Sequence, residues 1–175
     1  SEAVAQKIAS LEMAEDGEVF ASGMAAISTT LLALMSQGDH IVASADVYGG
    51  TYGLMTEDLP RLGIEVSMAD MRDVSSYEAA IQPNTKILYI EILTNPVLKV
   101  CDIEAFSVLA KKHNLLLIVD NTFTTPWAIN PIKMGADVVI HSTTKYLGGH
   151  SDVIMGALVT NDDKIAEEIY RIQNS

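Results

Sequence analysis

The sequence has little positive charge and only one cysteine. Its 175 residues carry 11 Lys and Arg against 23 Asp and Glu, a formal net charge of −12. Nucleic acids and anionic membranes bind to clusters of Lys and Arg, and no such cluster is present, so we expect neither as a partner. The single cysteine, Cys101, excludes an internal disulfide and indicates a reducing, cytoplasmic compartment.

Long apolar runs and targeting segments are missing as well. No stretch approaches the roughly 18 apolar residues that a membrane span needs, and the densest run, 115–119, has the length of a strand. No basic segment precedes an apolar run near the N-terminus, so the sequence shows no signal peptide. A hydrophobic fraction of 49% with 19% charged residues excludes a disordered chain and predicts one globular domain over 1–175.

Several common site motifs do not occur. The phosphate-binding pattern GxxxxGK[ST] and the dinucleotide pattern GxGxxG are absent, and no GxSxG makes Ser142 a hydrolase nucleophile. His141 and His150 lack further ligands at zinc-like spacing, so we expect no metal site and interpret both as buried or surface histidines. Cys101 has no motif around it and is interpreted as structural.

What the sequence does contain is an alternation of short apolar runs with helical patterns. This alternation predicts an α/β fold of three layers, a mostly parallel sheet with helices on both faces. We expect helices over 3–15, 24–37 with Gly38 ending it, 49–62, 74–82, 102–114 and about 162–173. The expected strands are 18–21, 40–45, 64–69, 86–92, 115–120, 137–141 and 154–160.

Polar residues follow several of the expected strands. In parallel sheets, ligands bind beyond the carboxyl ends of the strands. Three polar clusters stand at such ends, and a fourth opens the second helix, so we expect the four to converge. They are 94–96, 120–122, 142–145 and 22–24.

Two charged residues in these clusters suggest a carbonyl cofactor. Lys145 is compatible with an ordinary solvated lysine, but lysine also forms Schiff bases with carbonyl cofactors. Asp120 is compatible with a turn or cap residue, but an Asp at a strand end also suits the ring nitrogen of pyridoxal phosphate.

A phosphate group has candidate ligands at the same edge. Gly23 and Met24 open a helix whose free N–H groups and dipole favour an anion, and Ser142 and Thr144 add hydroxyl donors. Tyr48 is compatible with a packed surface tyrosine or with a ring that stacks on a flat cofactor, and in the second case its phenol is also a candidate catalytic group that moves a proton.

Five segments together resemble the pyridoxal-phosphate enzymes of cysteine and methionine metabolism, the cystathionine γ-synthase, γ-lyase and β-lyase group. They occur in the family's order and cover nearly the whole chain. The segments are 20–27 (FASGMAAI), 48–51 (YGGT), 91–96 (EILTNP), 119–123 (VDNTF) and 141–152 (HSTTKYLGGHSD).

The resemblance implies a role for each matching position. Lys145 is then the lysine that carries the cofactor and moves protons, Asp120 the partner of the pyridinium nitrogen, and Tyr48 the stacking residue. Asn95 is the implied donor to the 3′ oxygen of the cofactor, and Glu91 matches an acid near the site. The implied phosphate cradle consists of Gly23, Met24, Ser142 and Thr144.

The resemblance also implies an activity. It is that of a lyase or transferase that makes or breaks a C–S bond of a sulfur amino acid by β or γ elimination or replacement. Gly50 and the segment 149–152 favour the γ-synthase and γ-lyase forms. The alternatives are a cystathionine β-lyase, an O-acetylhomoserine sulfhydrylase, a methionine γ-lyase, and a non-enzymatic assembly module or inactive fragment.

Family members are longer than this chain and form homodimers or homotetramers. Their upstream Tyr-x-Arg segment and their C-terminal small domain, which holds the substrate carboxylate, have no counterpart in the 175 residues. The resemblance therefore implies the core of the large, cofactor-binding domain, inactive in isolation.

Overall fold

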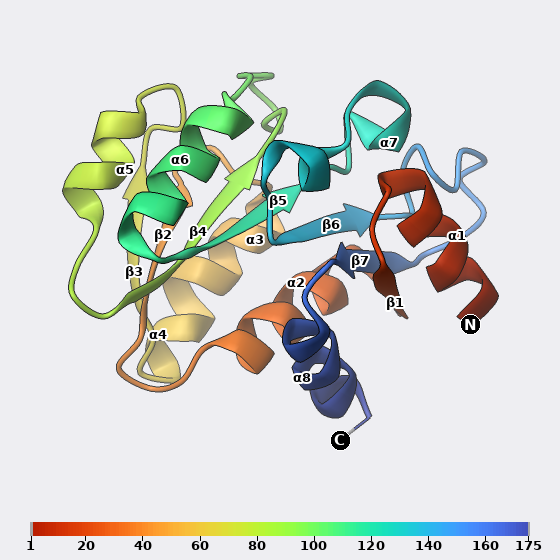
Figure 1. Ribbon diagram of the computed structural model, residues 1–175, viewed down its shortest axis with the longest axis horizontal. Helices are drawn as coiled ribbons and strands as arrows, with labels where there is room; N and C mark the ends of the chain where they lie inside the picture. Colours follow the sequence, from red (N-terminus) through yellow and green to blue (C-terminus); the bar gives the residue numbers. More distant parts are fainter. Residues whose placement is uncertain (1, 175) are drawn as a thin grey trace.

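The strands form one mostly parallel sheet, as predicted. The computed structural model describes residues 2–174, and within them seven strands pair in the order β1-β7-β6-β5-β4-β2-β3 (Figure 1). The neighbours from β3 to β6 are parallel, whereas β7 runs antiparallel to both β6 and β1. The strands are β1 (Asp16–Phe20), β2 (His40–Ser44), β3 (Glu65–Ala69), β4 (Thr85–Glu91), β5 (Leu116–Asp120), β6 (Val138–Ser142) and β7 (Gly156–Thr160).

Helices cover both faces of this sheet. The two main helical layers are α1 (Glu2–Glu12), α5 (Val74–Ala80) and α6 (Ile103–His113) on one face, and α2 (Gly23–Leu34), α3 (Gly49–Gly53), α4 (Leu59–Arg61) and α8 (Asp163–Gln173) on the other. A π-helical turn, η1 (Leu54–Asp58), joins α3 to α4. Two short elements, α7 (Thr125–Ala128) and η2 (Pro131–Met134), lie between β5 and β6.

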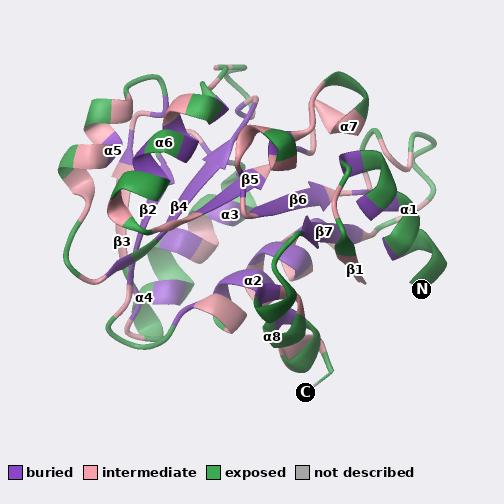
Figure 2. Cartoon of the chain, viewed as in Figure 1, coloured by how far each residue is buried: buried purple, intermediate pink, exposed green. Residues whose placement is uncertain are grey.

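Two apolar clusters, one on each face, account for the burial of the sheet. Alternate residues of a strand point to opposite faces, so Val119 packs in the cluster with α1 and α6 while its neighbour Ile118 packs in the cluster with α2 and α8. Figure 2 shows the central strands almost wholly buried and the outer sides of the helices exposed. Burial on both faces explains why these strands are continuous apolar runs.

Side chains cap the starts of α2, α5, α6 and α8. Asp102 accepts a hydrogen bond from Ala105 N at 3.0 Å, and Asp162 accepts one from Lys164 N at 2.8 Å. Both carboxylates satisfy N–H groups that have no partner within the helix. At the other end of α6, Asn114 adopts the left-handed conformation that commonly ends a helix (φ 55°).

The second helix ends earlier than predicted. α2 stops at Leu34 rather than at residue 37, because a local turn competes with it. Ser36 N donates to the Asp39 carboxylate at 2.8 Å, and Asp39 N donates to Ser36 O at 3.0 Å. Gly38, with φ +90°, lies in this turn instead of next to the helix end.

In the described part of the chain, no helix has both the length and the apolar character needed to cross a membrane.

Candidate active site

A cavity of about 240 Å³ opens at the carboxyl ends of β4, β5 and β6. These strands are parallel and in close register, with Glu91 paired to Asp120 and Asp120 paired to Ile140, so their ends are level. All eight residues that the sequence singled out as cofactor contacts line this one cavity. They are Gly23, Met24, Tyr48, Asn95, Asp120, Ser142, Thr144 and Lys145.

Asp120 lies half-buried at the end of β5. Its carboxylate accepts a hydrogen bond from Thr122 N at 2.9 Å and one from the Tyr89 hydroxyl at 3.4 Å. Burial raises the pKa of Asp120, while the Thr122 hydrogen bonds and the charge of His141 act in the opposite direction. Asp120 is thus an acid whose ionised form is stabilised by several hydrogen-bond donors.

Glu91 is a second carboxyl group on the neighbouring strand. It is 5% exposed, and its Oε1 accepts a hydrogen bond from Tyr48 N at 2.7 Å. Burial first, and then the charge of Asp120, raise the pKa of Glu91 to about 8. Glu91 is therefore mostly protonated at neutral pH.

The start of α2 closes the opposite wall of the cavity. Gly23 approaches β6 so closely that a Cβ on it would lie 2.6 Å from Ser142 Cβ, and a Cβ on Gly156 would lie 2.1 Å from Ser22 O. Ser22 caps the helix by accepting a hydrogen bond from Ala25 N at 3.0 Å. The N–H groups of Gly23 and Met24, in the first turn, have no partner within the helix.

The two hydroxyl residues of the expected phosphate cradle differ. The Thr144 hydroxyl donates to Met155 O at 3.1 Å and accepts from Met155 N at 3.0 Å, so it anchors the start of β7. The Ser142 hydroxyl makes no hydrogen bond to another residue of 2–174. Ser142 is therefore the more available donor of the two.

Lys145 and Tyr48 lie at the mouth of the cavity, and both are exposed. Within residues 2–174, Lys145 makes no ion pair, so its amine has no competing partner. The Tyr48 ring lies over Gly50, where a Cβ would meet Tyr48 Cε1 at 2.7 Å. Gly50 therefore leaves room for this ring position.

Asn95 lies on a loop that follows β4. Thr94, which is fully buried, holds the loop by accepting a hydrogen bond from Lys99 N at 3.0 Å and, through its carbonyl, one from Leu98 N at 2.9 Å. Leu93 and Val100 form a β-bridge that closes it. The loop is thus held on both sides of Asn95, which lines the cavity.

Other residues singled out from the sequence lie away from chemistry. Burial raises the pKa of the Cys101 thiol to about 12, so little thiolate exists at neutral pH. His150 is exposed and contacts Gly148 O. Within the described residues, no group of three or more His, Cys, Asp or Glu could hold a metal ion.

The sequence reasoning assigned no role to Glu12 or Thr122. Thr122 Oγ1 accepts a hydrogen bond from Ser142 N at 2.8 Å and so ties the end of β5 to the end of β6. Glu12 is fully buried behind the site. Its position i+4 from Ile8 and i+7 from Ala5, on the apolar face of the helix, was the available signal for a buried acid.

Comparison with known proteins agrees with this geometry. The family model described as Cys/Met metabolism PLP-dependent enzyme matches residues 1–175. Cystathionine γ-lyase of Bacillus subtilis is 52% identical over 168 residues, which are 96% of this chain and 44% of that protein. Cystathionine β-lyase of the same organism is 46% identical, over 99% of this chain and 44% of its own length.

The fold agrees equally well. A crystal structure of cystathionine γ-lyase from Lactobacillus plantarum, complexed with L-serine, superimposes with a TM-score of 0.96 at 48% identity. The match covers 98% of this chain and 45% of that one, so the chain spans less than half the length of these relatives. The chain belongs to the Cys/Met metabolism PLP-dependent enzyme family.

Proposed function

We propose that this chain is the cofactor-binding core of a pyridoxal-5′-phosphate-dependent enzyme. The enzyme would make or break a C–S bond of a sulfur amino acid by elimination or replacement at the β or γ carbon. The observation that carries the proposal is the cavity in which Lys145, Asp120 and the N-terminus of α2 face one space. A single-domain chain needs no such convergence for its stability.

The shape of the cavity fits this cofactor. A phosphate needs close approach to backbone N–H groups, and Gly23 provides it, because any side chain there would strike Ser142. A protonated ring nitrogen needs a carboxylate, which Asp120 supplies at another wall of the cavity. Gly23, Met24 and the Ser142 hydroxyl would hold the phosphate, Tyr48 would stack on the ring, and Asn95 would donate to its 3′ oxygen.

When bound, pyridoxal phosphate supplies a ring that accepts electrons from the substrate's α carbon. Asp120 keeps the proton on the ring nitrogen, which makes that acceptance possible. Lys145 would hold the cofactor through its amine, and the same amine, once free, would take up the proton of the substrate's α carbon. Proton transfer by a positioned group of this kind contributes roughly 10²- to 10⁴-fold to a rate.

Among the family's activities, we propose a γ-lyase or γ-synthase. Gly50 and the segment 149–152 support this choice, and so does the higher identity to a cystathionine γ-lyase (52%) than to a β-lyase (46%). Incubating the full-length protein with cystathionine, O-acetylhomoserine and methionine, and identifying the products, distinguishes the activities. Pyruvate from cystathionine would favour the β-lyase instead.

We further propose a cytoplasmic homodimer or homotetramer. Exposed apolar side chains lie in and beside the cavity: Ile154, at 76% exposure, lines it, and Tyr146, at 66%, packs on the lining residue Phe123. Apolar surface of this kind marks contact regions, which supports further protein over this face in the full-length molecule. Sedimentation of the full-length protein tests it, and a monomer would contradict the proposal.

The cofactor assignment has a direct test. Pyridoxal phosphate added to the full-length protein should produce an absorption band in the near-visible range, and reduction with borohydride should fix the cofactor to Lys145. The Lys145→Ala variant should lose both, while Lys164→Ala, an exposed lysine of α8, should keep them. A wild type without the band, or a label on another lysine, would overturn the assignment.

A further inference from the structure

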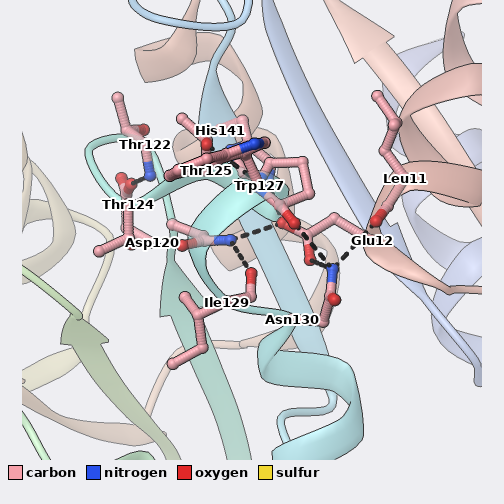
Figure 3. Close-up of polar contacts among 12 residues, drawn as sticks. Leu11, Glu12, Asp120, Thr122, Thr124, Thr125, Trp127, Ile129, Asn130 and His141 are labelled. Atoms are coloured by element: carbon pink, nitrogen blue, oxygen red, sulfur yellow. Dashed lines mark hydrogen bonds and ion pairs between the residues drawn. The ribbon is translucent and has the colours of Figure 1, made fainter.

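A polar cluster lies buried behind the cavity, on the face of the sheet that α1 covers. Glu12 and His141 are both 0% exposed. Glu12 Oε1 accepts a hydrogen bond from His141 Nε2 at 2.6 Å and another from Asn121 Nδ2 at 2.6 Å. Asn130 Nδ2 approaches the second oxygen at 3.4 Å. In Figure 3, Glu12 reaches from α1 toward His141 and Asn130.

The partners of Glu12 are the chain neighbours of two cavity residues. Asn121 follows Asp120, and His141 precedes Ser142. Because side chains alternate along a strand, Asp120 and Ser142 line the cavity while their neighbours turn toward α1. Glu12 Oε1 thereby holds the chain directly after Asp120 and directly before Ser142.

Stability alone does not account for this pair. A buried ion pair is commonly no better than an apolar pair of the same volume, because both charges lose their hydration. His141 Nδ1 is also buried without a hydrogen-bond partner among the described residues. Buried polar atoms in native proteins are normally satisfied, so the hydrogen bonding of this ring is incomplete in the described residues.

A positive charge on His141 would favour the ionised form of Asp120. The carboxyl groups of Glu12, Asp120 and Glu91 lie close to this strand edge, and like charges disfavour one another's ionisation. Two basic groups lie near them: Lys145 lines the same cavity, and His141 lies on β6. The charge of His141 lowers the pKa of Asp120 against the larger rise caused by burial. The other groups next to the Asp120 carboxylate, Tyr89 and Thr122, are neutral donors.

The turn after Asp120 also depends on this cluster. Thr125 has φ +61°, a left-handed conformation that β-branched residues rarely adopt. Such a conformation persists where surrounding contacts hold it. Asn121 O accepts from Thr125 N at 2.9 Å, and the Thr124 hydroxyl donates to the Asn121 side chain. Glu12 holds the other end of that side chain.

We propose that Glu12 and His141 are positioning residues for the cofactor site. Glu12 holds His141 as an imidazolium, and the pair keeps the Asp120 carboxylate ionised and aligned toward the cavity. Neither residue touches substrate or cofactor. The proposal rests on the proposed function, because it assigns Asp120 the task of holding a proton on the cofactor ring.

The first test needs no cofactor. Full-length protein with ¹⁵N-labelled histidine should show hydrogen on both ring nitrogens of His141 at pH 7.5, assigned by loss of the signals in His141→Gln. The Glu12→Gln variant keeps an acceptor oxygen but no charge, and its His141 should be neutral. A neutral His141 in the wild type would overturn the proposal, whether or not the protein binds pyridoxal phosphate.

The second test uses the loaded enzyme. Glu12→Gln and His141→Gln should lower kcat by roughly 10- to 100-fold, the range seen when outer partners of site residues are removed, with little change in KM. His40→Gln is the matched control: it removes the other fully buried histidine, far from the cavity, and should leave kcat unchanged.

Unchanged kcat in Glu12→Gln would refute the positioning role. If that variant does not fold, the wild-type ¹⁵N measurement and His141→Gln decide. Absence of cofactor binding in the wild type would instead refute the proposed function.

Discussion

The two edges of the sheet each bury a histidine, and they treat it differently. At the amino edge, His40 Nδ1 contacts the Thr85 hydroxyl at 2.7 Å and Nε2 contacts the Ser67 hydroxyl at 2.9 Å, so both nitrogens are satisfied by neutral groups. At the carboxyl edge, His141 has one carboxylate partner and one nitrogen without any among the described residues.

This difference separates structural polarity from functional polarity. Burial lowers the pKa of His40, so the neutral ring is favoured and its contacts serve to join β2, β3 and β4. His141 instead pairs with the buried carboxylate of Glu12, directly behind the residues that line the cavity. We interpret a buried polar group whose hydrogen bonds are complete as structural. A buried polar group that lacks a hydrogen-bond partner next to a cavity is the better candidate for a functional role.

The strongest test of the contrast is Lys145→Ala in the full-length enzyme. We expect kcat to fall by about 10⁴-fold or more, at the upper end of what proton transfer contributes. The melting temperature of the cofactor-free protein should be unchanged, because Lys145 is exposed. Steady-state kinetics and thermal denaturation check this. Retained turnover with cystathionine would place the chemistry elsewhere.

Asp120→Asn should have the next largest effect. The amide keeps the size and one acceptor but cannot balance a positive ring nitrogen, so we expect kcat to fall about 10²- to 10³-fold. Asp102→Asn, at the cap of α6, is the control and should leave kcat unchanged. If the two variants had the same kcat, the carboxyl edge of the sheet would no longer be distinguished as the catalytic part of the fold.

Replacing Glu91 should have a smaller effect, which appears in the pH dependence of the melting temperature. Its pKa in the folded protein is about 8, against 4.5 for a free side chain. Between these values the folded state binds more protons than the unfolded state, so the free energy of unfolding falls as pH rises. The cofactor-free wild type should therefore lose several degrees of melting temperature between pH 5 and pH 8 relative to Glu91→Gln.

Glu78→Gln provides the opposite reference for that measurement. The pKa of Glu78 is lowered by hydrogen bonds from Lys112 and His113, so its contribution is lost only as pH falls. A wild type that tracks Glu91→Gln at every pH would mean that Glu91 is ionised in the folded protein.

His40→Gln should have the smallest effect on activity and a clear one on stability. Leaving Thr85 or Ser67 without a buried partner costs about 1–3 kcal/mol, measured by urea denaturation, while kcat stays at the wild-type value. A fall in kcat would show that contacts at the amino ends of the strands affect the cavity at their carboxyl ends.

Much of this organisation could be predicted from the sequence. Each expected strand exists within a few residues, because apolar runs of strand length leave few alternatives, and the residues after 91, 120 and 142 meet at one edge as parallel topology requires. The direction of β7 was not predictable, since a buried antiparallel strand has the same apolar pattern as a parallel one.

The cluster behind the site was not predictable either. His141 and Glu12 are 129 positions apart. Glu12 belongs to no motif, and His141 opens the segment 141–152 without a role being implied for it. Pattern reasoning weighs residues by type and local context, so it assigned His141 to ordinary burial and left Glu12 in a helical stripe. Only the packing of α1 against β6 and β7 reveals that the two form one unit.

The position of α1 has a consequence for synthesis. Glu12 of α1 bonds to Asn121 and His141, and β1 pairs with β7, so residues 2–20 find these partners more than a hundred positions later in the chain. During synthesis this segment therefore precedes its partners and docks only after the strands up to β7 have been made. The Glu12 cluster behind the cavity is thus a late contact in the folding of this region.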